Sequence, residues 1–256
     1  GAGTGKTVVA MHRARWLANH VCKDQEQILF TTFTKNLAAD IQANLKQICS
    51  VAELEKIEVI NLDAWVHRFL RKRDYKYRVN FKGDESGAHW EHACEIIPSG
   101  VNMDANFLRD EWDHVIQAQG IESVSDYIKA SRIGRPQKLE RADRKKIWPV
   151  FEEYRALLTE NGLRESVDVI RDARQIIEDE NASLPYRCVI IDEAQDFSAE
   201  AFRLIRSITC KESADKRNDI FIVGDAHQRI YGHRVVLPQC GIEFGDRHYK
   251  LRVNYR

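Results

Sequence analysis

The 256-residue sequence has no net charge, because 39 Lys and Arg residues balance 39 Asp and Glu residues. This balance excludes a histone-like protein, so any anionic partner must be held by local clusters of basic residues. No apolar run approaches the roughly 20 residues that a membrane-spanning helix needs, and we expect no membrane partner. The six cysteines include no Cys-x-x-Cys pair, a pattern typical of reduced thiols in an intracellular protein rather than of a disulfide framework.

What is present is an alternation of strand-like and helical patterns, interrupted by a long helical stretch. Before the interruption, the spacing predicts helices at 8–21, 36–48 and 64–71 and strands at 27–33 and 57–60. The helical stretch contains predicted helices at 112–118, 125–130, 141–158 and 167–178. Strand-like runs resume at 188–191 and 220–223.

Such alternation predicts an α/β fold with a parallel sheet and crossover helices. The helical insertion is roughly a hundred residues long, about the size of a small domain. We therefore expect a first part of the sheet domain at 1–72, the insertion at 73–181, and the second part of the sheet domain at 182–256.

The chain opens on Gly1-Ala2-Gly3-Thr4-Gly5-Lys6-Thr7, which matches the end of a phosphate-binding loop. Glycines let successive backbone N–H groups face one anion, so we predict nucleotide contacts by Gly1, Gly3, Thr4, Gly5, Lys6 and Thr7. Lys6 would reach the β- and γ-phosphates, and the Thr7 hydroxyl would bind Mg²⁺. An ordinary glycine-rich turn is the alternative. The loop's first residue and its strand would precede Gly1, so we interpret the sequence as a piece of a longer protein.

A second motif, Asp192-Glu193-Ala194-Gln195-Asp196, follows the strand predicted at 188–191. Two acids after a strand lie at the carboxyl edge of a parallel sheet, where ligands of α/β folds bind. We predict that Asp192 holds the metal and that Glu193 orients and deprotonates the attacking water. Alone, such a pair would more often cap a helix; beside a phosphate-binding loop, the catalytic interpretation is favoured.

Further motifs follow in a fixed order: Thr32-Phe33-Thr34-Lys35-Asn36, then the acidic box, then Val223-Gly224-Asp225-Ala226-His227-Gln228-Arg229-Ile230-Tyr231, and finally Asn254-Tyr255-Arg256. With the phosphate loop, this series resembles the UvrD/Rep-like superfamily 1 helicases over essentially the whole chain. The resemblance implies a RecA-like P-loop NTPase fold, with the helical stretch as the family's 1B insertion. Asn61-Leu62-Asp63-Ala64-Trp65 departs from the corresponding family box.

The resemblance also implies roles for individual residues. Gln195 and Gln228 would sense the γ-phosphate, Tyr255 would stack on adenine, and Arg256 would act as an arginine finger. Contacts to single-stranded DNA would come from the segment Thr32, Phe33 and Thr34 and from Tyr231, where core packing is the alternative interpretation of the aromatic rings. His233 stands where many members have an aromatic residue, so its contact to DNA would be weaker stacking or a polar contact.

Two basic clusters could hold a nucleic acid. The first spans 68–78, includes Arg71, and lies beside the predicted DNA edge of the sheet. The second spans 129–146, where a merely solvated face is an equally good interpretation.

From these residues and the resemblance we expect an ATP- and Mg²⁺-dependent motor that moves along single-stranded DNA or at a junction of single and double strands. The family implies 3′–5′ movement, a role in repair or recombination, a second RecA-like domain in the same longer chain, and a cytoplasmic, nucleoid-associated location. The alternatives are a P-loop kinase or ATPase that does not act on DNA and a degenerate adaptor.

Overall fold

The structure is a computed structural model that describes residues 5–79, 84–98, 103–133, 135, 137–209, 218–225, 235–249 and 251, without the side chains of 84–86. The sheet domain contains α1 (Lys6–His20), β1 (Gln27–Thr32), α2 (Lys35–Ile48), α3 (Val51–Glu55), β2 (Ile57–Asn61), α4 (Leu62–Arg71), α9 (Ser166–Asp179), β5 (Tyr186–Ile191), η2 (Ala194–Asp196), α10 (Ala199–Ile208), β6 (Ile220–Ile222) and η4 (Leu237–Cys240). The helical lobe contains α5 (Asp84–Cys94), α6 (Ala105–Glu111), η1 (Trp112–Gln117), α7 (Val124–Lys129) and α8 (Arg141–Glu160). In the described residues, no helix combines the length and the apolar character needed to cross a bilayer.

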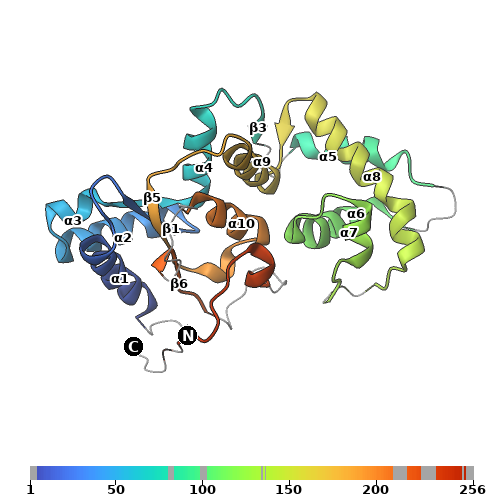
Figure 1. Cartoon of the computed structure of the whole chain (residues 1–256). Coiled ribbons are helices and arrows are strands. Elements are labelled where there is room, and N and C mark those ends of the chain that lie inside the picture. Colours follow the sequence, from blue (N-terminus) through green and yellow to red (C-terminus); the bar gives the residue numbers. More distant parts are fainter. Residues whose placement is uncertain are drawn as a thin grey trace.

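The predicted α/β class and parallel sheet are confirmed. The four strands pair in the order β2-β1-β5-β6, and every pair is parallel. Parallel strands need crossover connections, and helices supply them on both faces of the sheet. Figure 1 shows α1, α2 and α3 on one side of the strands and α4, α9 and α10 on the other.

Alternation along β1 explains why both faces are covered. Ile28 and Phe30 pack into the cluster formed with α1 and α2, whereas Leu29 between them packs with α4, α9 and α10. All three side chains are fully buried. A strand that is buried on both faces has a continuous run of apolar residues. This run is the pattern from which the sequence predicts β1.

The helical lobe has a core of its own, built around stacked aromatic rings. Trp90 stacks on Tyr154 with ring centroids 4.1 Å apart, and Trp112 meets the Tyr154 ring edge-on at 5.2 Å. Two short parallel strands, β3 (Arg78–Val79) and β4 (Leu163–Arg164), form the connection between lobe and sheet domain. The described side chains therefore form one core in the lobe and a core on each face of the sheet.

Helix α9, which the sequence assigns to the insertion at 73–181, packs against helices of the sheet domain. Helix α9 packs with α4 and α10, and its buried residues Val169, Ile170, Ala173 and Ile177 belong to the core on one face of the sheet. Figure 1 shows α9 beside α4 rather than among the lobe helices. Helical periodicity identified α9 but carries no information about which core it covers, and on this packing we propose a boundary near residue 165.

A buried polar contact fastens the lobe to the start of α9. Glu165, which precedes α9, accepts hydrogen bonds from Trp112 Nε1 (2.7 Å), Gln117 Nε2 (2.9 Å) and the Tyr154 hydroxyl (2.8 Å). Burial raises the pKa of Glu165, and the Trp112 donor acts in the opposite direction. The lobe therefore contacts α9 through a shared carboxylate.

A π-helical segment, η1, makes this triple contact possible. In an α-helix, residues five apart differ by about 140° around the axis. In a π-helix the hydrogen bonds run from i to i+5, so residues five apart lie nearly one above the other. Trp112 and Gln117 are the two ends of η1, and both donate to Oε2 of Glu165.

We expect Glu165→Ala to lower the free energy of unfolding of the lobe by about 2–4 kcal/mol, because it leaves buried donors without an acceptor. Denaturant titration followed by the fluorescence of Trp90, Trp112 and Trp148, which all lie in the lobe core, measures this. Glu160→Ala, at an exposed position on α8, is the matched control. Equal unfolding midpoints for the two variants would show that the carboxylate does not stabilise the lobe.

Candidate functional site

Helix α1 begins at the predicted phosphate loop. Its N-cap is Gly5, with φ 73° and no atom within 4 Å of the position that a Cβ would occupy. The first N–H groups of a helix have no partner within the helix, and together with the helix dipole they form an anion site. Lys6 is the first residue of α1, so the described end of the loop has the geometry that a phosphate requires.

The two predicted motifs meet in space. The Thr7 hydroxyl donates a 2.7 Å hydrogen bond to Oδ2 of Asp192, which follows β5 and lies 185 residues away in the chain. Asp192 is fully buried, and Oδ1 accepts a 2.9 Å hydrogen bond from the backbone N–H of Glu193. Burial raises the pKa of Asp192; the Thr7 hydroxyl, the Glu193 N–H and the charge of Lys6 oppose that shift.

Glu193 lies in a left-handed backbone conformation, with φ 52° and ψ 45°. For a residue with a side chain, such a conformation costs of order 1–3 kcal/mol and is often found at functional sites. It begins the turn η2, in which Gln195 Nε2 donates to Glu193 Oε2 at 2.5 Å. The backbone N–H of Asp225, just after β6, donates to Gln195 Oε1 at 2.9 Å.

Oxygen ligands at this place suit a hard cation. Thr7 and Asp192 offer a hydroxyl and a carboxylate at hydrogen-bonding distance from each other, the ligand type that Mg²⁺ prefers. Asp192 is buried at the edge where the loop lysine contributes positive charge. These residues therefore fit the predicted metal.

Several predicted site residues lie outside the described part of the chain. They are Gly1, Gly3 and Thr4 of the phosphate loop, Gln228, Tyr231 and His233 after β6, and Tyr255 and Arg256 at the end. Their proposed roles stay predictions that rest on the resemblance.

The predicted DNA segment lies at the carboxyl end of β1, between the ends of β2 and β5. Phe33 is 40% exposed and meets the buried ring of Phe197 edge-on at 6.3 Å. Thr34 caps α2 by accepting from the N–H of Leu37 at 3.3 Å. Thr32 is completely buried. Of the three, the Phe33 ring is therefore the one that offers a broad face to a ligand.

The first basic cluster is divided between internal contacts and solvent. Arg68 pairs with Glu58, and Arg73 pairs with Glu180 at 2.9 Å. Arg71 is exposed at the end of α4, roughly 14 Å along the helix from the carboxyl edge of the sheet. A single strand of DNA that contacts Phe33 would need to run along α4 to reach Arg71.

Three arginines of the second basic cluster have structural roles. Arg132 holds the fully buried Glu111 through two bonds of 2.7 and 2.8 Å, and Arg135 lies 3.7 Å from the same carboxylate. Arg144 donates to three backbone carbonyls at the end of α7. The basic residues of this cluster that remain exposed are Lys129, Lys138, Arg141, Lys145 and Lys146. These three arginines therefore make contacts within the protein, which neither interpretation from the sequence included.

Trp65, within the box that departs from the family, is a core residue. It is 2% exposed, and Nε1 donates to the Tyr186 hydroxyl at 3.0 Å. Its stacking partner is Phe69 on the same helix. In this structure the Trp65 side chain therefore belongs to the core of the sheet domain.

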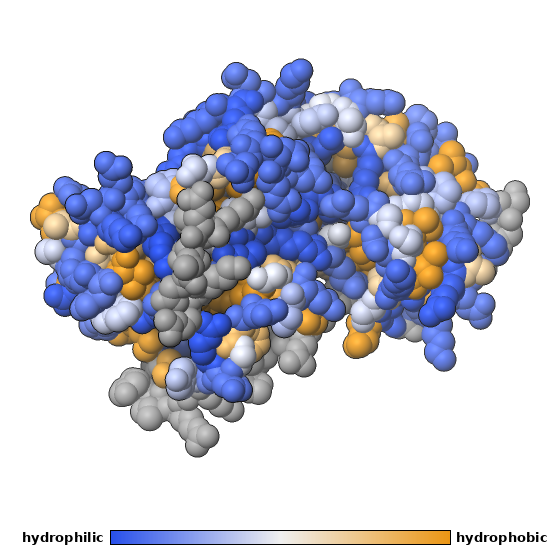
Figure 2. Space-filling view, in the orientation of Figure 1, coloured by the Kyte–Doolittle hydropathy of each residue, from blue (hydrophilic) through white to orange (hydrophobic). Residues whose placement is uncertain are grey.

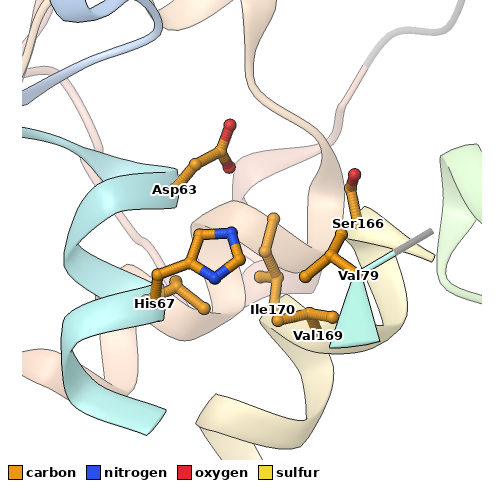
Figure 3. A pocket seen from close by; sticks show the side chains of 7 residues that line it. Asp63, His67, Val79, Ser166, Val169 and Ile170 are labelled. Atoms are coloured by element: carbon orange, nitrogen blue, oxygen red, sulfur yellow. The ribbon is translucent and has the colours of Figure 1, made fainter. Parts of the chain in front are cut away.

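A shallow pocket lies between α4 and α9, close to β3 (Figure 3). Asp63, His67 and Ser166 line it over an apolar floor that includes Val79 and Ile170. These are the side-chain types of a hydrolase triad, but none of the hydrogen bonds found among the described residues joins them. The pocket is separate from the residues around Asp192.

The sequence did not reveal the link between the acidic box and β6. Ala194 N–H donates to Val223 O at 3.0 Å, and Gln195 contacts the Asp225 backbone. Both bonds depend on strand order, which a single sequence does not specify. The one sign of this link in the sequence was Gly224, which the resemblance places in a motif. A glycine there permits the close approach of two backbones.

Comparison with known proteins gives consistent results. Residues 1–246 match the family model described as the UvrD/REP helicase N-terminal domain. The chain is 23% identical to a probable DNA helicase of Mycoplasma pneumoniae, over 91% of this chain and 44% of that protein. It is 25% identical to the ATP-dependent DNA helicase UvrD2 of Mycobacterium tuberculosis, over 96% and 36%, and 23% identical to DNA helicase II of Salmonella typhimurium, over 100% and 35%. The chain thus spans less than half the length of these relatives.

Proposed function

This chain belongs to the UvrD/REP helicase N-terminal domain family, and on that premise we propose that it is the first motor domain of an ATP-dependent DNA helicase. The observation that carries the proposal is the 2.7 Å bond between Thr7 and Asp192. It joins the phosphate loop to the acidic box, as a nucleotide-hydrolysing site requires.

Each of the residues around this bond has its own role in hydrolysis. Lys6 and the N-terminus of α1 hold the phosphates, and Thr7 and Asp192 hold Mg²⁺, which when bound neutralises phosphate charge. Glu193 orients the attacking water and accepts its proton. From the family we assign Tyr255 to adenine and Gln228 and Arg256 to the γ-phosphate.

We further propose that the motor contains a second RecA-like domain in a longer chain. Closure of two such domains around ATP would move the protein along single-stranded DNA, and the family suggests 3′–5′ movement, a repair or recombination role and a location on the nucleoid. The helical lobe, from about residue 73 to about 165, would be the 1B insertion.

For the DNA path we propose the carboxyl edge of the sheet. Phe33 offers an exposed ring there, and Arg71, with Lys72 and Lys76, provides cations on the exposed surface beyond. Tyr231 and His233 are assigned to the same path from the family. Figure 2 shows hydrophobic side chains as scattered patches among hydrophilic ones, so the described residues do not form a broad apolar surface on this face.

ATPase assays on the full-length protein, with and without single-stranded DNA, test this function. We expect turnover that depends on Mg²⁺ and rises with DNA. Turnover that DNA does not stimulate would favour a P-loop enzyme of another kind. ATP binding without turnover would favour an adaptor.

We expect Phe33→Ala to weaken binding of single-stranded DNA by about 5- to 150-fold, because stacking contributes about 1–3 kcal/mol per base. Fluorescence anisotropy with a labelled oligonucleotide at fixed salt measures this. The matched control is Phe244→Ala, since Phe244 is 39% exposed, as Phe33 is 40% exposed. Equal affinity of the two variants would show that the DNA path does not include Phe33.

A further inference from the structure

The side-chain amide of Gln195 connects the proposed catalytic glutamate to the end of β6. Its Nε2 donates to Glu193 Oε2 at 2.5 Å, and its Oε1 accepts from the backbone N–H of Asp225 at 2.9 Å. The orientation of the amide is fixed by its partners, because a backbone N–H can only donate and an ionised carboxylate can only accept. Reversing the amide would lose both bonds.

The backbone around this amide is closely packed. A Cβ on Gly224 would lie 3.0 Å from Gln195 Oε1 and 3.2 Å from the backbone nitrogen of Ala194. That same nitrogen donates to Val223 O at 3.0 Å. The turn that carries Glu193 is therefore held directly against the end of β6, and a displacement of either backbone changes the bonds of Gln195.

We propose that Gln195 is a positioning residue that holds the Glu193 carboxylate in its working orientation and makes that orientation depend on the position of Gly224 and Asp225. The inference rests on the proposed function of Glu193 as the base for water. Residues 226–234, which follow Asp225, contain the proposed DNA contacts of Tyr231 and His233. Within the described residues, the carboxylate is thus linked to the end of β6 through one amide.

This role differs from the one that the family resemblance implies, a direct contact of Gln195 with the γ-phosphate. A direct contact contributes to ATP affinity, so its loss raises KM or the Kd of an ATP analogue. A positioning role acts on the orientation of Glu193, so its loss lowers kcat and leaves affinity in place. The two roles therefore predict opposite divisions between kcat and KM.

The experiment uses the full-length protein and Gln195→Met, which preserves length but cannot hydrogen bond as an amide. We expect kcat with single-stranded DNA to fall about 10- to 100-fold, as is usual when a residue that orients a catalytic group is lost. The KM for ATP, and the Kd of a non-hydrolysable ATP analogue, should stay within about twofold. Gln47→Met, at an exposed position on α2, is the matched control.

Two further variants test whether Gln195 acts through Glu193 and whether Gly224 affects its position. Gly224→Ala keeps the amide but crowds it, so kcat should fall in the same direction and by less. If Gln195→Met does not fold, Gly224→Ala replaces it as the test. Combining Gln195→Met with Glu193→Gln should give no loss beyond that of Glu193→Gln, because both act through one carboxylate.

An unchanged kcat in Gln195→Met overturns the inference, as does a raised KM with kcat intact. So does a loss that multiplies with that of Glu193→Gln, since Gln195 would then act independently of Glu193. Failure of the proposed function is a separate result: Glu193→Gln itself would keep its turnover.

Discussion

Replacing Glu193 by Gln is expected to lower ATP turnover by about 10²- to 10⁴-fold, the usual contribution of a general base. The amide has nearly the shape of the carboxylate but cannot accept the proton of the attacking water. Binding of ATP should remain, because Lys6, Thr7 and Asp192 are unchanged. Steady-state ATPase assays and equilibrium binding of a fluorescent ATP analogue, both on the full-length protein, measure the two quantities.

The control for this variant is Glu55→Gln, which removes the same charge from an exposed position at the end of α3. It should leave both turnover and binding unchanged. Turnover of Glu193→Gln equal to that of the unmodified protein would remove the assignment of Glu193 as base. If the unmodified protein binds ATP but shows no turnover, the adaptor interpretation is favoured instead.

The second large effect is expected for Lys6→Ala, which should weaken ATP binding by about 30-fold to several thousandfold. Removing one partner of a desolvated charge pair typically costs about 2–5 kcal/mol, because the other charge loses its compensation. Here the uncompensated charge is that of the nucleotide phosphates. Titration with a fluorescent ATP analogue measures the affinity directly.

Lys46→Ala is the control, since Lys46 carries the same charge at an exposed position near the end of α2. Binding of AMP shows whether the loss of affinity comes from the β- and γ-phosphates. AMP lacks both of them, so Lys6→Ala should change the affinity for AMP much less than the affinity for the ATP analogue. Equal weakening of both nucleotides would mean that Lys6 does not act on those phosphates.

The fold of the sheet domain could be predicted because its signals are local. The strands at 27–32 and 188–191 are buried on both faces and are visible as apolar runs, and the helices around them keep their periodicity. The predicted starts of α1 and α4 are each two residues late, and the predicted ends agree to within one residue. The convergence of Thr7 with Asp192 followed from one further rule, that ligands of α/β folds bind at the carboxyl edge of the sheet.

What could not be predicted depends on partners that are distant in the sequence. Arg132 and Arg144 are part of a basic run, yet Glu111 and the carbonyls of α7 occupy them, so counting charges overestimates the exposed cations. Thr32 belongs to a DNA-binding motif by resemblance but has its side chain in the core. Periodicity also does not show which of two cores a helix covers, so the packing of α9 on the sheet domain could not be read from the sequence.

The π-helical turn η1 has a consequence for how the lobe tolerates change. Such a turn takes up one residue more than an α-helical turn, so everything that follows it is rotated by about 100° relative to a continuous helix. The joint contact of Trp112 and Gln117 with Glu165, just before α9, thus depends on the number of residues in η1 as well as on their identity. Substitutions at exposed positions such as His114 leave that number intact, whereas loss of a single residue there would separate the indole of Trp112 from the amide of Gln117. Chain length within this turn, more than the chemistry of its exposed side chains, decides whether both ends of η1 can reach one carboxylate oxygen.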